Sequence, residues 1–279
     1  MSERRVASTG RGFDALRIPI VRNFALGRIV SGLSQQIVSV AVGWELYERT
    51  RDPWVLGLVG IFTLAPSLLL MLPAGNWADQ YPRRNLAILA GVLTALASVA
   101  LAVVSWQQGP VELVLAILML FGAARAISAP AAGTILPQLL EPRLFANVNT
   151  WIISCMQISS VIGPAVGGGL IALSNDAMSS YIVAAVLQFM FVGLLATLPS
   201  VAPPQGAKRT LSDIFAGFAF MWRTPVFLAA ITLDLFAVLL GGAVALMPVY
   251  ARDVLFVGPE GLGLMRAAAA AGASENMPR

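Results

Sequence analysis

The feature that most constrains the fold is a series of long apolar runs that contain no charged residue. Residues 54–74 and 85–106 are two such runs, and only a short polar segment separates them. At about 1.5 Å of rise per residue, a helix of about 20 residues crosses a hydrocarbon core of about 30 Å. Each run is therefore expected to span a membrane as one α-helix, with a tight turn between them at the membrane surface.

The composition supports the same class of protein. The 279 residues are 58% hydrophobic and 11% charged, whereas a soluble domain is about 25% charged. Continuous runs of this length exclude a β-barrel, whose segments are short and alternate in polarity. The chain has no histidine and a single cysteine, Cys155, so it has no internal disulfide and almost no means of binding zinc. We expect an all-α polytopic membrane protein that is not an enzyme, needs no cofactor or metal, and buries Cys155 as inert packing.

The distribution of arginine and lysine predicts the orientation. With the N-terminus inside, the cytoplasmic segments hold eleven of these residues and the opposite loops hold three, as the positive-inside rule requires. The basic tail 1–22 has no apolar core of its own, so we expect an uncleaved first span. The predicted spans are 24–47, 54–78, 85–106, 111–137, 146–173, 178–199 and 226–250, with an incomplete eighth from about residue 259.

One long connection divides the chain into two parts. A six-helix bundle over 23–199 is followed by a cytoplasmic linker over 200–224 and by the start of a second bundle over 225–279. Apolar residues recur at helical spacing in the linker, which favours an amphipathic helix on the membrane surface, although a flexible linker is the alternative. Residues 44–52 are weakly echoed by 247–253 on the same side of the membrane, as in transporters built from two parallel halves.

Polar residues within the spans are candidates for a watered central cavity, because a polar stripe that faces lipid is costly. Hydrogen bonding to neighbouring helices is the competing explanation. Glu45 and Asp234 are candidate proton carriers, and a structural ion pair remains open for each. Arg125 is expected either to pair with Glu45 or to bind an anionic substrate. The cavity candidates are Arg28, Ser31, Gln35, Ser39, Arg125, Thr150, Ser154 and Gln157.

Glycines give the fifth span a face without side chains, so that a neighbouring helix can approach closely. These are Gly163, Gly167, Gly168 and Gly169. Pro164 frees a backbone carbonyl and permits a kink. A hinge and a tight but static helix contact are both consistent with this pattern.

Two segments resemble motifs of the major facilitator superfamily. Between the second and third spans, the segment 75–84 resembles the loop G-x-L-A-D-R-x-G-R-R, with Gln80, Pro82 and Trp77 as departures from it. The segment 159–168 of the fifth span resembles the antiporter motif G-x-x-x-G-P-x-x-G-G, with Ser159 in place of the leading glycine. The matching residues are Gly75, Ala78, Asp79, Arg83 and Arg84 in the first motif and Gly163, Pro164, Gly167 and Gly168 in the second.

Residues 122–137 and 233–236 resemble the bacterial exporter branch that includes the enterobactin exporter and macrolide-efflux proteins. The resemblance implies a proton-coupled exporter of a small siderophore or drug-like molecule, working by alternating access in the bacterial inner membrane. It also implies that Asp79 caps a helix of the second half and holds the cytoplasmic gate shut. The implied partners are the lipid bilayer, a small-molecule substrate and protons, with no nucleic acid and no required protein partner.

The last apolar run, 262–273, is too short to cross a bilayer and contains Arg266. Because members of the superfamily have two six-helix halves, we expect this chain to be a C-terminally truncated one. The alternative function is a membrane protein that does not transport, either a remnant or a partner that docks on another chain.

Overall fold

The computed structural model describes residues 17–132, 135, 145–201, 224–225, 228–229, 232–233 and 243–275. Within them the chain is helical and contains no β-strand, which confirms the all-α class. Six helices are long and apolar enough to cross a membrane, namely α1 to α4, α6 and α7. The bounds are α1 Pro19–Thr50, α2 Pro53–Gln80, α3 Arg83–Trp106, α4 Val111–Ala132, α6 Phe145–Ser174, α7 Met178–Ala196, α10 Ala243–Val249, a π-helical turn η3 Tyr250–Val254, and α11 Gly258–Glu275.

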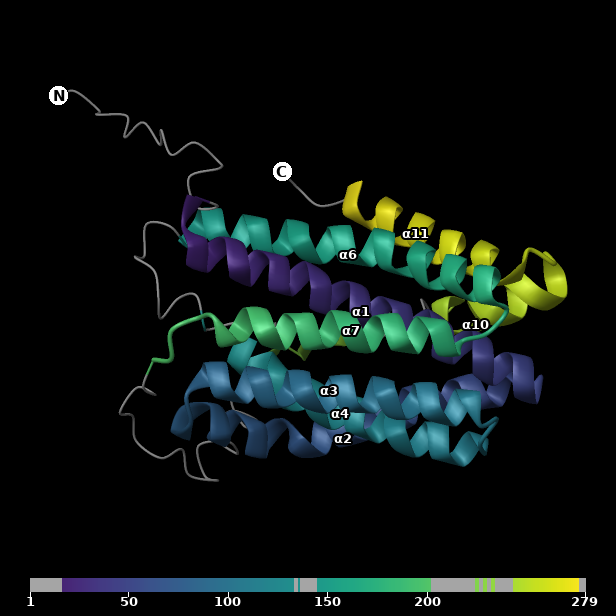
Figure 1. Ribbon diagram of the computed structural model, residues 1–279, viewed down its shortest axis with the longest axis horizontal. Helices are drawn as coiled ribbons and strands as arrows, with labels where there is room; N and C mark the ends of the chain where they lie inside the picture. The colour runs from purple at the N-terminus through teal and green to yellow at the C-terminus, as the bar shows by residue number, and fades with distance from the viewer. Residues whose placement is uncertain are drawn as a thin grey trace.

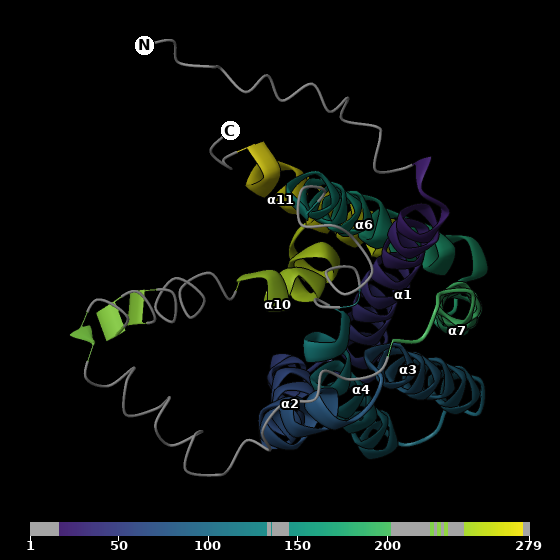
Figure 2. The same cartoon turned by 90° about the vertical axis from the view of Figure 1, so that its left-hand side faces the viewer.

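The six long helices lie side by side along the longest axis of the molecule (Figure 1). Helix α1 packs between α6 and α7, α3 packs between α7 and α4, and α4 packs on α2. Helix α11 packs on the other side of α6, and α10 lies beside α1 (Figure 2). We call the end where α2 meets α3 the α2–α3 end, and the opposite end, where α1 meets α2, the α1–α2 end.

Local sequence explains the sharp breaks between helices. Helix α1 ends because Arg51 adopts a left-handed conformation with φ 54°. The Asp52 side chain then caps α2, accepting a hydrogen bond from the Trp54 amide at 2.9 Å, and Pro53 occupies the first helical position. At the other end only Tyr81 and Pro82 separate α2 from α3. Asp79 and Gln80, predicted as part of the turn, instead form the end of α2.

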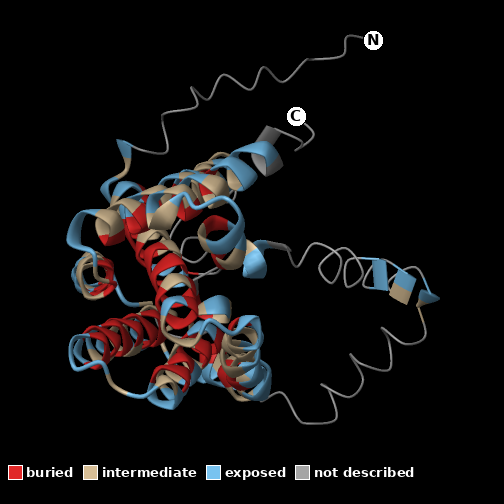
Figure 3. Cartoon of the chain, turned by 90° about the vertical axis from the view of Figure 1, so that its right-hand side faces the viewer, coloured by how far each residue is buried: buried red, intermediate tan, exposed pale blue. Residues whose placement is uncertain are grey.

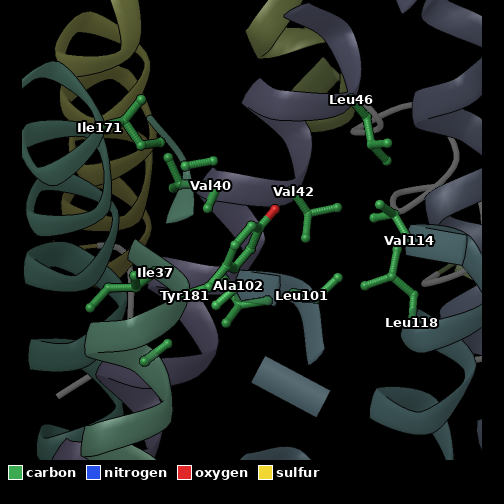
Figure 4. Packing of buried hydrophobic residues seen from close by; sticks show 14 of the residues in the cluster. Ile37, Val40, Val42, Leu46, Leu101, Ala102, Val114, Leu118, Ile171 and Tyr181 are labelled. Carbon is green, nitrogen blue, oxygen red and sulfur yellow. The ribbon is translucent and has the colours of Figure 1, made fainter. Parts of the chain in front are cut away.

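Buried residues line the faces that the helices turn toward one another (Figure 3). They form two clusters, one toward each end of the bundle. The cluster near the α1–α2 end surrounds the fully buried Tyr181 of α7, which lies among Ile37, Val42 and Leu101 (Figure 4). Leu69 on α2 is 76% exposed, as expected for a side chain that faces lipid.

The end of the chain forms a helix where the incomplete eighth span was predicted. Helix α11 begins at Gly258 and continues to Glu275, beyond the apolar run at both ends. It is not among the six helices that are long and apolar enough to span a membrane within the described residues. The predicted amphipathic linker helix and Asp234 lie outside the residues that the structure describes.

Candidate functional site

A cavity of about 530 Å³ lies where α1, α2 and α6 meet α10 and α11. Its walls are mostly apolar or made of glycine and alanine. The polar wall residues are Gln36 and Ser39 on α1, Ser160 on α6 and Arg266 on α11. This volume is within the usual range of about 300–1,000 Å³ for a small-molecule site.

Arg266 and Ser39 contact each other across the cavity. The Arg266 Nη1 donates a hydrogen bond to the Ser39 Oγ at 3.0 Å, joining residues 227 positions apart in the sequence. Gly43 lies next to the guanidinium, since a Cβ built there would be in van der Waals contact with the Arg266 Nη2 at 3.5 Å. Sequence reasoning missed Arg266 as a site residue and treated it as an anomaly in a short apolar run.

The other predicted cavity residues lie elsewhere. On α1, Ser31 is buried and accepts a hydrogen bond from the Gln35 Nε2 at 3.2 Å, while Arg28 is half-buried. On α6, Gln157 is contacted by the neighbouring Ser160, whose Oγ donates to the Gln157 backbone carbonyl at 2.8 Å. Of the eight candidates, Ser39 is the one among the described wall residues of this cavity. Thr150 and Arg125 are exposed and Ser154 is half-buried.

Arg84, in the first turn of α3, contacts α7 within the same bundle. Arg84 donates from Nε to the carbonyl of Leu195 at 3.1 Å and from Nη2 to that of Ala196 at 2.6 Å. These are carbonyls of the last turn of α7, where a cation is favourable. Ala78 is buried, Asp79 and Arg83 are half-buried, and a Cβ built on Gly75 would contact nothing within 4 Å.

The small residues of α6 contact two helices, not one as predicted. Toward α1, the Ser159 Oγ donates to the Ile29 carbonyl at 3.0 Å, and a Cβ on Gly163 would lie 2.5 Å from that of Gln36. Gly167 also faces α1, near Ile37. Each glycine here allows two backbones to approach closely.

Gly168 faces α11 instead, where an added Cβ would lie 2.4 Å from the Pro259 carbonyl oxygen. Gly263 of α11 faces back, and its Cβ would lie 2.5 Å from the carbonyl oxygen of Pro164. A Cβ on Gly169 would meet nothing within 4 Å, so this glycine does not belong to either contact.

Glu45 is buried in an ion pair near the α1–α2 end. Its Oε1 lies 2.8 Å from the Arg49 Nη2, and its Oε2 accepts a hydrogen bond from the Tyr181 hydroxyl at 2.7 Å. Arg49 also donates to the Gly109 carbonyl at 2.8 Å, tying α1 to the turn between α3 and α4. The structure therefore pairs Glu45 with Arg49 and not with Arg125. The four-residue spacing of Glu45 and Arg49 was the available sequence signal.

A second charged group joins α1 to η3 at the same end, and we call it the outer charged cluster. Glu48 pairs with Arg252, and the Tyr47 hydroxyl donates to the Asp253 carboxylate. The guanidinium of Arg51 lies 3.8 Å from Asp253, and that of Arg252 lies 5.6 Å from the centre of a Trp44 ring. The two segments that echo each other in the sequence are thus in direct contact, which their similarity did not predict.

Comparison with known proteins places this geometry in a family. The model of the family described as Major Facilitator Superfamily matches residues 24–274. The chain belongs to the major facilitator superfamily. It is an integral membrane protein, and the matched range runs from within α1 to within α11.

The curated relatives of this superfamily member include exporters. The chain is 27% identical over 212 residues to the Enterobactin exporter EntS of Shigella boydii serotype 4, an alignment that covers 75% of this chain and 50% of the relative. The protein of the same name from Escherichia coli O1:K1 matches with the same identity and coverage. The chain therefore spans about half the length of the curated relatives it matches.

Solved structures share the fold. A bacterial homologue of the human lysosomal transporter Spinster, in an inward-facing and unoccupied conformation, matches with a TM-score of 0.73 and 17% identity, over 92% of this chain and 60% of that one. The inward-facing and occupied form of such a homologue matches with a TM-score of 0.70 and 16% identity, over 93% of this chain and 59% of that one.

Proposed function

We propose that this chain contributes to a secondary active transporter that exports a small organic molecule from the bacterial cytoplasm. The observation that carries the proposal is the cavity, which is walled by helices of the six-helix bundle and by α10 and α11 together. A site between two such parts becomes accessible from alternate sides when one part rocks against the other. The exporter relatives support the outward direction, and enterobactin is a reasonable first substrate to test.

The proposed orientation places the N-terminus and the α2–α3 end in the cytoplasm of the inner membrane, following the distribution of basic residues. The outer charged cluster then lies on the far side of the cavity from the cytoplasm. Outward opening would separate Glu48 from Arg252 and Tyr47 from Asp253, which join α1 to η3. The close contact of α6 with α11 is the natural pivot.

Proton coupling is part of the proposal, with Glu45 and Asp234 as candidate carriers. Coupling requires a carboxyl group whose pKa differs between the open and closed states. Glu45 lies outside the cavity wall and is held by Arg49 and Tyr181, so its protonation would act on the substrate through movement of α1. Asp79 is proposed to hold the cytoplasmic side closed, as the motif implies.

The test is accumulation of labelled enterobactin in everted inner-membrane vesicles from cells that produce the protein. We expect accumulation above that of vesicles lacking the protein, abolished by nigericin, which removes the pH gradient. Equal accumulation in both vesicle types would contradict export of this substrate. Accumulation that persists with nigericin would contradict proton coupling while leaving export in place.

Two residues proposed from the sequence are tested in the same vesicles: Arg125, a substrate contact outside the described cavity wall, with Arg125→Ala, and Asp234, a proton carrier, with Asp234→Asn. Each is expected to lower the initial rate of accumulation by at least about tenfold, the scale of losing one charged interaction. Arg22→Gln, an exposed arginine at the start of α1, is the control for a lost positive charge. Unchanged transport in both test variants would mean that other residues carry the substrate and the proton.

A further inference from the structure

The wall of the cavity carries a half-buried cation with few partners among the described residues. The Arg266 guanidinium has five N–H donors, and its described contact is the single hydrogen bond from Nη1 to the neutral Ser39 hydroxyl. Its Nε is buried and donates to no group among the described residues. Within that part of the chain, Arg266 therefore has donors available for a ligand.

The charge of Arg266 is also unbalanced among the described residues. Arg49 pairs with Glu45, and Arg252 pairs with Glu48, but no described carboxylate pairs with Arg266. A charged side chain within membrane-embedded helices is costly unless it meets an opposite charge or water. A negatively charged ligand bound in the cavity would supply the missing opposite charge.

The remainder of the wall defines what kind of ligand fits. Leu56, Val59 and Pro164 offer apolar contact on the sides, and Gln36 and Ser160 add neutral polar groups. A guanidinium binds carboxylate, sulfonate or phosphate oxygens through two parallel N–H donors. With about 530 Å³ of space, the complementary ligand has an apolar body and one anionic group.

We propose that Arg266 is the anion-recognition residue of the cavity, and that the substrate class is an amphipathic organic anion whose acidic group binds the guanidinium beside Ser39. This inference rests on the proposed function in one respect: it takes the cavity to be the site of the transported molecule. Binding at the cavity is measured without transport, so the two proposals fail separately.

The test uses two fluorescent dyes of the same shape and different charge, with the protein in phosphatidylcholine nanodiscs. Anilinonaphthalene sulfonate is an anion, and N-phenylnaphthylamine is its neutral counterpart. Arg266→Gln is expected to weaken binding of the sulfonate by about tenfold or more and to change binding of the neutral dye by less than about twofold, as for loss of one charge-assisted hydrogen-bonded contact. Empty nanodiscs give the background from lipid.

Three further variants separate charge from packing. Arg266→Lys keeps the charge and is expected to bind the sulfonate within about fivefold of the wild-type affinity. Ser39→Ala removes the partner of Nη1 and is expected to cause a smaller, about threefold loss for the sulfonate alone. Arg22→Gln, outside the cavity, is expected to bind both dyes as the wild type does.

An unchanged affinity of Arg266→Gln for the sulfonate would overturn the proposal, and so would an equal loss for both dyes. If Arg266→Gln does not fold, Ser39→Ala replaces it: an unchanged affinity for the sulfonate, or an equal loss for both dyes, would then overturn the proposal. Charge-selective binding together with failed enterobactin transport would leave the anion site standing and remove only the proposed export of that molecule.

Discussion

Two of the contacts that join residues 243–275 to the six-helix bundle differ in kind. Between α6 and α11, glycines bring backbone against backbone, with Gly168 and Gly263 facing each other. Between α1 and η3, charged side chains meet at the outer charged cluster, where the Glu48 side chain is 42% exposed and that of Arg252 is 23% exposed.

Because of this difference, we infer that the glycine contact is the pivot of the movement and that the charged contact holds the outer side closed. A glycine contact has no side chains that can rearrange, and its packing is lost if the helices move apart by a fraction of an ångström. An exposed ion pair exchanges its partner for water at little cost, about 0–1 kcal/mol. A transporter that rocks needs both kinds of contact, and the structure places them on different helix pairs.

The largest effect is expected at the buried ion pair of Glu45 and Arg49, which also lies at the α1–α2 end. Arg49→Ala leaves the Glu45 carboxylate without its cation, and the Glu45 side chain is only 7% exposed. Breaking such a pair costs about 3–5 kcal/mol, so the melting temperature of the purified protein should fall sharply. A decrease no larger than that of Arg252→Ala would show that exposure is not what distinguishes the two pairs.

The next effect is expected at the glycine contact. A methyl group added by Gly168→Ala would lie 2.4 Å from the Pro259 carbonyl oxygen, and forcing it in costs about 1–3 kcal/mol. Gly169→Ala is the matched control, because its methyl group meets nothing within 4 Å and alanine is favoured over glycine in a helix by about 1 kcal/mol. Thermal unfolding in detergent should show opposite shifts. Equal shifts in melting temperature would show that α6 and α11 do not pack closely at Gly168.

A smaller effect on stability, and a clearer one on conformation, is expected at the outer charged cluster. Arg252→Ala should lower stability by about 0–1 kcal/mol. Loss of 1 kcal/mol changes a two-state population about fivefold. The measurement uses a cysteine in place of Ser160 in the cavity wall, in a Cys155→Ala background. With Arg252→Ala added, this cysteine should react up to about fivefold faster with a membrane-impermeant maleimide. Gly169→Ala in the same background serves as the control. Slower labelling would contradict closure by this cluster.

The smallest effect is the response to salt. The Debye length falls from about 10 Å at 0.1 M salt to about 3 Å at 1 M, so added sodium chloride should raise the labelling rate of the wild type slightly. In Arg252→Ala the same salt step should have a smaller effect, since the Glu48 to Arg252 pair is already absent and the pair of Arg51 with Asp253 remains. An equal response in both proteins would locate the salt-sensitive contact elsewhere.

Sequence patterns predicted the parts of the fold that depend on neighbouring residues. Long apolar runs predicted the six long helices. The structure extends the C-terminal end of α1 to Thr50, because the turn residues Arg51 and Asp52, and not the last apolar residue, end the helix. The close packing of α6 was also predictable from its glycines. Its division between α1 and α11 was not, because Gly167 and Gly168 point about 100° apart on one helix and each needs its own neighbour.

The cavity residues illustrate the limit most clearly. Polarity at helical spacing selected Ser39 together with Ser31 and Gln35, yet the latter two bond to each other on α1. Arg266 had no favourable pattern around it, and its significance came only from its place opposite Ser39.

The sequence by itself determined that this is a helical membrane protein with tight, small-residue helix contacts, because hydropathy and helix geometry act over one or two turns. Only the tertiary structure decided which charges meet and which remain available: Glu45 with Arg49 and Tyr181, Glu48 with Arg252, and Arg266 at the cavity. Such pairings depend on how helices far apart in the chain are rotated and shifted relative to one another. A local sequence pattern predicts neither the rotation nor the shift.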